Sequence, residues 1–249
     1  MTEREWLGTC INESEWLACR TVQRPEMPDN LDYCWQRCGL LFAAACCRSV
    51  WHLLPDGPSR IAVVTAEAHA DGLQGRSELL EAEQKAYEAA ERLLEQTPDL
   101  EWKRSPTWHA MWAAASLTGA TSGRRPISGA SHHTQYAIAW ERAPRPNQRE
   151  EREAIRQFEG QRQWRWVVDI FGHPFRRSNL NPVWLAWKDR NVPKLAQSIY
   201  VERAFERLPV LADALEEAGC EDANILTHCR SDGQHIRGCW VLDLLLGKE

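Results

Sequence analysis

The chain has 249 residues and a mass of 28.6 kDa, which allows one large domain or two small ones with a buried core. Hydrophobic residues make up 43% and charged residues 26% of the sequence, a globular composition that excludes a wholly disordered chain. No apolar run is long enough to cross a membrane, and the polar start of the chain is unlike a secretory signal. We therefore expect a cytoplasmic protein that has no membrane partner.

The formal net charge of −5 is unevenly distributed along the chain. Residues 1–100 carry −8, residues 101–190 carry +7, and residues 191–249 carry −4. The simplest consequence is attraction between the basic middle and the acidic flanks within one molecule. Binding of an acidic partner by the middle is the alternative.

Cysteine and tryptophan are both abundant. Nine cysteines in a chain without an export signal favour reduced thiols, which we expect to be small buried hydrophobes. The 13 tryptophans outnumber the five phenylalanines and four tyrosines, so tryptophan supplies most of the aromatic volume. Because each indole N–H needs a partner, we expect many tryptophans at half-buried seams between helices.

The first half of the chain shows helical patterns of apolar residues. A short helix is expected from Glu3, and the most apolar helix is expected over residues 31–54, where Pro55 ends it. This second helix is our predicted central core element. Each of the next three helices begins at a serine suited to be an N-cap: Ser59, Ser77 and Ser105.

The region 118–147 is rich in glycine, serine and proline. It begins LTGATSGRRPISGASHH, ends in a second proline-rich break, and leaves room for one short helix near residues 136–141. We predict a flexible linker here, between an N-terminal helical lobe over residues 1–117 and a C-terminal helical lobe over residues 148–249.

Helical patterns continue to the end of the chain. Helices are expected over residues 149–171, 209–219 and 239–246, with further starts at Asn181, Asn191 and Asp222. No alternating strand pattern of convincing length occurs. The sequence therefore predicts an all-α fold of about ten helices in one or two packed lobes, with no substantial β-sheet.

A cluster of potential metal ligands lies near the C-terminus. It consists of Cys220, His228, Cys229, His235 and Cys239. Zinc prefers four nitrogen or sulfur ligands in a tetrahedron, and two helix ends joined by a turn can bring such residues together. The alternative is structural packing, because the cluster has no Cys-x-x-Cys pair and its spacing matches no familiar zinc motif.

Basic and aromatic residues alternate in a second stretch. The residues concerned are Arg162, Trp164, Arg165, Arg176 and Arg177. Arginine and exposed tryptophan can neutralise phosphates and stack on bases, which would suit a nucleic acid. The acidic isoelectric point of about 5.9 and the lack of a nucleic-acid-binding motif argue against this partner.

Several segments together resemble a known set of proteins. They read FAAACCRSVWHLL at residues 42–54, DIFGHPFR at 169–176, LPVLADALEEAGC at 208–220 and HIRGCWVLDLLLGKE at 235–249. This wording resembles a family of uncharacterised paralogous proteins found chiefly in planctomycetes. The family has no established activity, so the resemblance implies a helical cytosolic protein and transfers no catalytic residue.

No serine-hydrolase, nucleotide-binding or HExxH motif occurs, so we name no catalytic residue. Our first hypothesis is a non-catalytic, all-α interaction or regulatory module with a protein partner that the sequence does not identify. The first alternative is a zinc-binding protein or metal-assisted hydrolase that uses the C-terminal cluster. The second is a nucleic-acid binder that uses the basic middle region.

Overall fold

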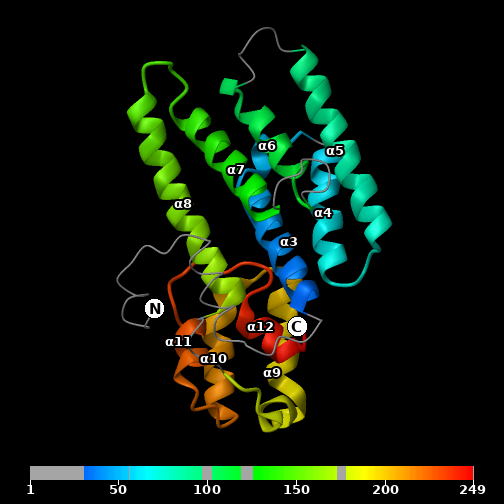
Figure 1. Cartoon of the computed structure of the whole chain (residues 1–249). Coiled ribbons are helices and arrows are strands. Elements are labelled where there is room, and N and C mark those ends of the chain that lie inside the picture. The colour runs from blue at the N-terminus through cyan, green and yellow to red at the C-terminus, as the bar shows by residue number, and fades with distance from the viewer. Residues whose placement is uncertain (1–30, 56, 97–102, 119–125, 173–177, 249) are drawn as a thin grey trace. The chain divides into compact units, whose positions relative to one another are not determined.

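All regular elements in the described part of the chain are helices, as the sequence predicts. The computed structural model describes residues 31–55, 57–96, 103–118, 126–172 and 178–248 (Figure 1). The helix expected from Glu3 lies outside these residues. The α-helices are α3 (Leu31–Ser49), α4 (Pro58–Ala70), α5 (Arg76–Gln96), α6 (Pro106–Ala114), α7 (Pro126–Arg142), α8 (Arg149–Phe171), α9 (Pro182–Glu202), α10 (Leu208–Glu217), α11 (Ala223–Cys229) and α12 (Trp240–Leu246).

The described residues also form two short 3-10 helices, Trp51–Leu53 and Phe205–Arg207, and they contain no strand. Within the same residues, no helix has the length and apolar character that crossing a membrane requires. The expectation of an all-α fold is thereby confirmed for the described chain.

Side-chain caps fix several helix starts. The side chains of Ser105, Asn181 and Asp222 accept backbone N–H groups of the first turns of α6, α9 and α11, at donor–acceptor distances of 3.2, 3.0 and 2.8 Å. These three predicted caps are confirmed. The cap predicted at Ser59 is wrong, because Gly57 with φ +117° is the N-cap and Pro58 begins α4.

The described residues form two compact units. We call residues 36–167 the central unit, and residues 31–35 together with 168–248 the C-terminal unit; the boundary falls within α8. This division differs from the predicted lobes 1–117 and 148–249.

The central unit is built on α3. Its residues Leu41, Phe42, Cys46 and Cys47 are all at most 2% exposed, which agrees with the predicted core helix. The α-helix ends at Ser49, and a 3-10 turn follows before Pro55, so the regular helix is shorter than predicted. In the same unit α4 packs against α5, α5 against α6, and α6 against α7 (Figure 1).

Helix α7 occupies most of the predicted linker 118–147. The small residues that suggest a linker allow a close helix contact: a Cβ on Gly129 would lie 2.9 Å from the Cβ of Ser116, just after α6. Ala130 and Thr134 are fully buried on α7. Glycine and serine here serve close packing between helices, which composition alone does not distinguish from a flexible segment.

A buried polar network fixes α7 against α8. Gln163, which is 2% exposed, accepts hydrogen bonds through Oε1 from Ser131 Oγ at 2.7 Å and from Gln135 Nε2 at 2.9 Å. Its amide Nε2 donates to Thr134 Oγ1 at 2.9 Å. Because each of these bonds depends on one relative position of the two helices, the network specifies their register.

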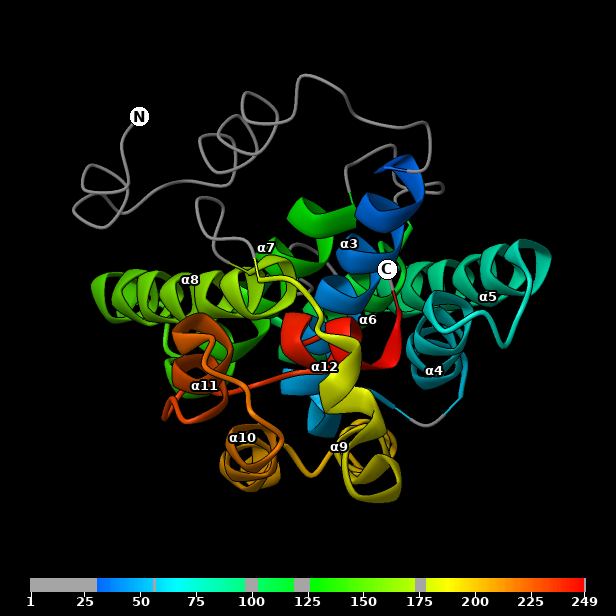
Figure 2. The ribbon, with the colours of Figure 1, turned by 90° about the horizontal axis from the view of Figure 1, so that it is seen from below.

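The C-terminal unit has its own apolar core. Helix α9 packs against α10 and α12, and α10 also packs against α11 (Figure 2). Helix α9 is broken at Lys188, Asp189 and Arg190, which have φ values of 41°, 55° and 65°. The predicted helix starts at Asn181 and Asn191 lie on either side of this break. The largest fully buried side chains of the core are Tyr200, Ile199, Leu208, Leu211, Leu215, Ile225 and Leu242.

The tryptophans and cysteines occupy the environments that their types predict. Among the described side chains, Trp108, Trp166 and Trp184 are buried, whereas Trp51, Trp112, Trp140, Trp164, Trp187 and Trp240 are half-buried. Arginine side chains cover several of the half-buried rings; Arg152, for example, lies 3.8 Å from the ring centroid of Trp140. Six cysteines of the described chain are buried free thiols: Cys38, Cys46, Cys47, Cys220, Cys229 and Cys239.

A histidine pair lies between α6 and α7. The Nε2 atom of His109 lies 3.0 Å from the carbonyl oxygen of Lys103, and its Nδ1 atom lies 3.3 Å from Nδ1 of His133. Since a carbonyl only accepts, neutral His109 carries its proton on Nε2 and accepts through Nδ1 from His133. Burial lowers the pKa of His109 to about 4.

This low pKa predicts acid sensitivity of the central unit. Above pH 6.5 His109 is neutral in the folded and unfolded chains, but between pH 6.5 and 4 the unfolded chain takes up the proton first. The free energy of unfolding should therefore fall by about 3 kcal/mol over this range through His109 alone. His109→Gln should remove that part of the loss, measured by urea denaturation at a series of pH values.

The matched control is His69→Gln, which replaces a half-exposed imidazole at the end of α4. It removes an imidazole without touching the His109–His133 pair, so the acid-induced loss of stability assigned to His109 should persist in this variant. An unchanged profile in His109→Gln would contradict the assignment of this acid sensitivity to His109.

Candidate metal centre

Four side chains of the C-terminal unit point their donor atoms at one another. They are Asp169 in the last turn of α8, His228 in α11, His235 in the connection that follows, and Cys239 at the N-cap of α12. One ligand atom from each residue lies within 4.8 Å of the others. These four residues, all in the described part of the chain, could therefore act together as ligands of one metal ion.

Short contacts link the four residues. Nε2 of His228 lies 3.1 Å from the Sγ of Cys239 and 3.2 Å from Oδ1 of Asp169. The same Oδ1 lies 2.6 Å from Nδ1 of His235. These contacts bring an imidazole, a thiol and a carboxylate around one point, and a second imidazole adjoins the carboxylate.

The local sequence explains how these residues are placed. Asp222 begins α11 as its N-cap, so that His228 falls in the last turn of the helix. Gly238, with φ +96°, turns the chain just before Cys239. The backbone N–H of Ile236 donates to Oδ2 of Asp169 at 2.9 Å and so fixes the connection against α8.

The carboxylate of Asp169 is almost completely buried, with a side-chain exposure of 5%. Burial raises its pKa, but the hydrogen bonds from His228 and His235 and their charges outweigh that effect. The pKa of Asp169 therefore lies below its ordinary value, and the group is ionised at neutral pH. With Oδ2 accepting from the backbone, Oδ1 is the oxygen that faces the two imidazoles.

The thiol of Cys239 is fully buried. Burial raises its pKa well above the ordinary value, and the carboxylate of Asp169 raises it further, against a weaker opposing effect of the backbone amide of Leu242. A thiol of this kind is protonated and inert at neutral pH. It becomes a good ligand when a metal cation takes the place of its proton.

The geometry distinguishes a metal shell from a cysteine–histidine–aspartate catalytic triad. In a triad, the carboxylate holds the imidazole nitrogen opposite the one that faces the nucleophile. Here Asp169 and Cys239 approach the same nitrogen of His228, so the imidazole does not bridge them through its two nitrogens as it would in a triad. Around a tetrahedral zinc ion, ligand atoms lie about 3.3 to 3.6 Å apart, close to the 3.1 and 3.2 Å separations of His228 Nε2 from its two neighbours. The 2.6 Å contact of His235 Nδ1 with Asp169 Oδ1 is a hydrogen-bond distance and would have to lengthen when a metal binds.

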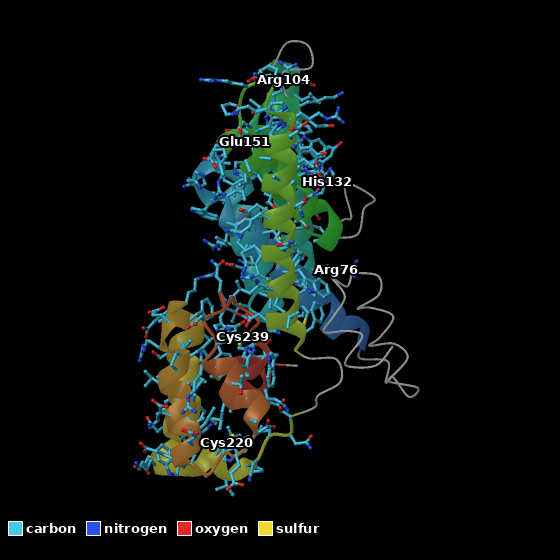
Figure 3. All side chains as sticks on the ribbon, turned by 90° about the vertical axis from the view of Figure 1, so that its left-hand side faces the viewer. Arg76, Arg104, His132, Glu151, Cys220 and Cys239 are labelled. Atoms are coloured by element: carbon cyan, nitrogen blue, oxygen red, sulfur yellow. The ribbon has the colours of Figure 1, made fainter. Side chains whose placement is uncertain are left out.

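The structure brings together three of the five predicted ligands, His228, His235 and Cys239, and leaves Cys220 and Cys229 outside the group. Figure 3 shows Cys220 well apart from Cys239. Cys229 follows His228 on α11, where successive side chains point about 100° apart, and its thiol packs into the apolar core. Burial raises the pKa of Cys229 to about 12.

Asp169 is not among the ligands predicted from the sequence. The residue lies 66 positions before His235, inside a helix whose neighbouring residues are apolar. A carboxylate flanked by Val168, Ile170 and Phe171 is the one signal that could have marked it, because an unpaired buried charge is costly.

The candidate nucleic-acid residues do not form a shared exposed surface among the described residues. Arg162 lies 2.7 Å from a carboxylate oxygen of the buried Glu159 and covers the ring of Trp166. Trp164 is half-buried and Arg165 is exposed, while Arg176 and Arg177 lie outside the described residues. Packing within the central unit therefore accounts for Arg162.

Comparisons with protein-family models, curated proteins and solved structures find no match. The class of protein that the fold and the site define is thus an all-α protein with a four-residue candidate metal centre.

Gly172 and Trp240 pack together beside the candidate metal centre. Gly172 ends α8 with φ +67°, and a Cβ there would lie 3.3 Å from the ring of Trp240. That ring packs in turn on His228, with centroids 5.1 Å apart. Close approach and positive φ together favour glycine at position 172.

We expect Gly172→Ala to lower the free energy of unfolding more than Gly247→Ala does. Both glycines have similar positive φ values, but Gly247 has no neighbouring atom within 4 Å of an added Cβ. Backbone strain alone should cost Gly247→Ala about 1 kcal/mol, and displacement of Trp240 should add about 1 kcal/mol more in Gly172→Ala. Equal losses in chemical denaturation would contradict the role of the Trp240 contact.

Proposed function

We propose that this chain is a zinc-binding, non-catalytic helical protein whose metal ion stabilises the C-terminal unit. The ion would be held by Oδ1 of Asp169, Nε2 of His228, Nδ1 of His235 and Sγ of Cys239. The observation that supports this best is the approach of a thiol and a carboxylate to one and the same imidazole nitrogen. A proton on that nitrogen is at best shared between the two neighbours in a weak three-centre bond, whereas a cation among the donors can bond to each of them.

The charge and type of the ligands favour Zn²⁺. One carboxylate, one thiolate and two neutral imidazoles carry a charge of −2, which a divalent cation neutralises inside a buried site. A thiolate together with imidazoles suits zinc better than magnesium or calcium, which prefer oxygen ligands. Four protein ligands complete a tetrahedron, as is typical of structural zinc sites.

A metal-assisted hydrolase is the alternative use of the same residues. Catalytic zinc sites keep one coordination position for water or substrate, and they open to a cleft. Here four protein donors are present, and Asp169 and Cys239 are buried. This closed arrangement supports a structural role for the metal, which is compatible with a non-catalytic interaction or regulatory module.

The direct test is metal content and metal binding. Untagged protein prepared without chelators should contain about one zinc per chain by elemental analysis. The metal-free protein should bind Co²⁺ and give the visible absorption of a tetrahedral, thiolate-ligated ion. Zn²⁺ at 100 times its Kd should raise the free energy of unfolding by about 2.7 kcal/mol, measured as a shift in denaturation midpoint.

Two buried cysteines provide a matched pair of variants. Cys239→Ala should weaken Zn²⁺ binding by more than about 100-fold, beyond the loss typical of an outer-shell change. Cys229→Ala should leave binding unchanged, although its thiol is equally buried and belongs to the same core. Asp169→Asn, which preserves side-chain size, repeats the test without removing a core atom.

Wild-type protein that binds neither Zn²⁺ nor Co²⁺ would remove the proposal. Equal losses of affinity in the Cys239 and Cys229 variants would show that the metal binds elsewhere. A cobalt spectrum that shows a fifth, exchangeable ligand would favour the hydrolase alternative.

A further inference from the structure

Ser231 lies between two of the proposed ligands on the outer side of the centre. Its hydroxyl Oγ donates to the backbone carbonyl of His228 at 2.8 Å. The same Oγ lies 3.4 Å from Nε2 of His235, the imidazole nitrogen that faces away from Asp169. One hydroxyl thereby connects His228 and His235 through atoms that do not face the metal position.

The direction of each hydrogen bond follows from the donor and acceptor types. The carbonyl of His228 only accepts, so the hydroxyl hydrogen of Ser231 is used in that bond. The oxygen lone pair of Ser231 is then available to accept an N–H from Nε2 of His235. In the metal-free chain Nδ1–H of His235 donates to the ionised Asp169; once a metal ion takes the place of that proton, the neutral imidazole carries its proton on Nε2, the nitrogen that faces Ser231.

The burial of His235 makes this acceptor important. The side chain of His235 is 7% exposed, so water has little access to its outer N–H. A buried N–H without an acceptor costs free energy, and metal-bound histidines usually donate their second N–H to an oxygen. Among the described side chains, Ser231 supplies an oxygen in position for this bond.

We infer that Ser231 is a positioning residue that fixes His235 as an Nδ1 ligand of the proposed metal. This inference rests on the proposed function, because it concerns the same centre. It adds that the two histidines bind through different nitrogens, His228 through Nε2 and His235 through Nδ1. It also implies that the short connection between α11 and α12 contributes to metal affinity through Ser231.

The test compares Zn²⁺ affinities of full-length variants by competition with a chromophoric chelator. Ser231→Ala should bind Zn²⁺ about 10- to 100-fold more weakly than the wild type, as expected for loss of an outer-shell acceptor. Ser231→Thr retains the hydroxyl and should bind within about threefold of the wild type. Gln234→Ala, an exposed and uncharged control in the same connection, should leave the affinity unchanged.

A spectroscopic measurement separates positioning from general stability. Long-range ¹H–¹⁵N spectra of the zinc-loaded wild type should show the proton of His235 on Nε2 and the metal on Nδ1. Coordination of His235 through Nε2, or equal affinities of Ser231→Ala and the wild type, would overturn the inference while leaving the metal proposal in place. A wild type that binds no Zn²⁺ would remove both.

Discussion

The ionised carboxylate of Asp169 is nearly inaccessible to water, and the organisation of the C-terminal unit depends on how that charge is compensated. Transfer of an uncompensated carboxylate into a protein interior costs several kcal/mol. Both oxygens are therefore used: Oδ2 by the backbone of Ile236, and Oδ1 by the imidazoles of His228 and His235. These partners come from α11 and the segment after it, so one charge fixes that segment against the end of α8.

The central unit compensates its buried carboxylates in another way. Glu67 pairs with Arg48 at 2.8 Å, and Glu159 lies 2.7 Å from Arg162. Arginine is a permanent cation without a lone pair for a metal, so such pairs offer no metal site. Asp169 instead faces imidazoles, which are neutral ligands when unprotonated, and a thiol that gains a charge only by losing its proton. This choice of partners is what distinguishes a potential metal centre from a buried ion pair.

The sequence predicted those parts of the fold that depend on local interactions. Helix caps such as Ser105 and Asp222 and the apolar spacing of α3 act over one or two turns, and the structure confirms them. Gly129 shows where prediction from local sequence fails, because close helix contacts and flexible linkers both favour small residues. The difference lies in what packs against the glycine, which its neighbours in the sequence do not reveal.

The same distinction applies to the candidate metal centre. His228, His235 and Cys239 lie close together in the sequence and share a cluster with Cys220 and Cys229, which composition does not separate from them. The direction of each side chain separates them: Cys229 points into the apolar core, while His228 points toward Asp169. The fourth member depends on tertiary structure, because Asp169 is distant in sequence and is brought to the site by α8.

A metal ion bound here would act where the unit has least regular structure. The segment between α11 and α12 contains no α-helix. Ordering a short segment that lacks the regular backbone hydrogen bonds of a helix costs much conformational entropy. Ile236 and Asp169, joined across 67 positions, already close a long loop, and ligands on both sides of that contact would close it again with a stronger bond. The apolar core, which draws residues from α9 to α12 and includes Cys239, contains neither histidine of the centre. Loss of the metal should therefore loosen the segment between α11 and α12 before the core unfolds. In this respect the metal would act as a cross-link in a unit whose apolar core is already packed.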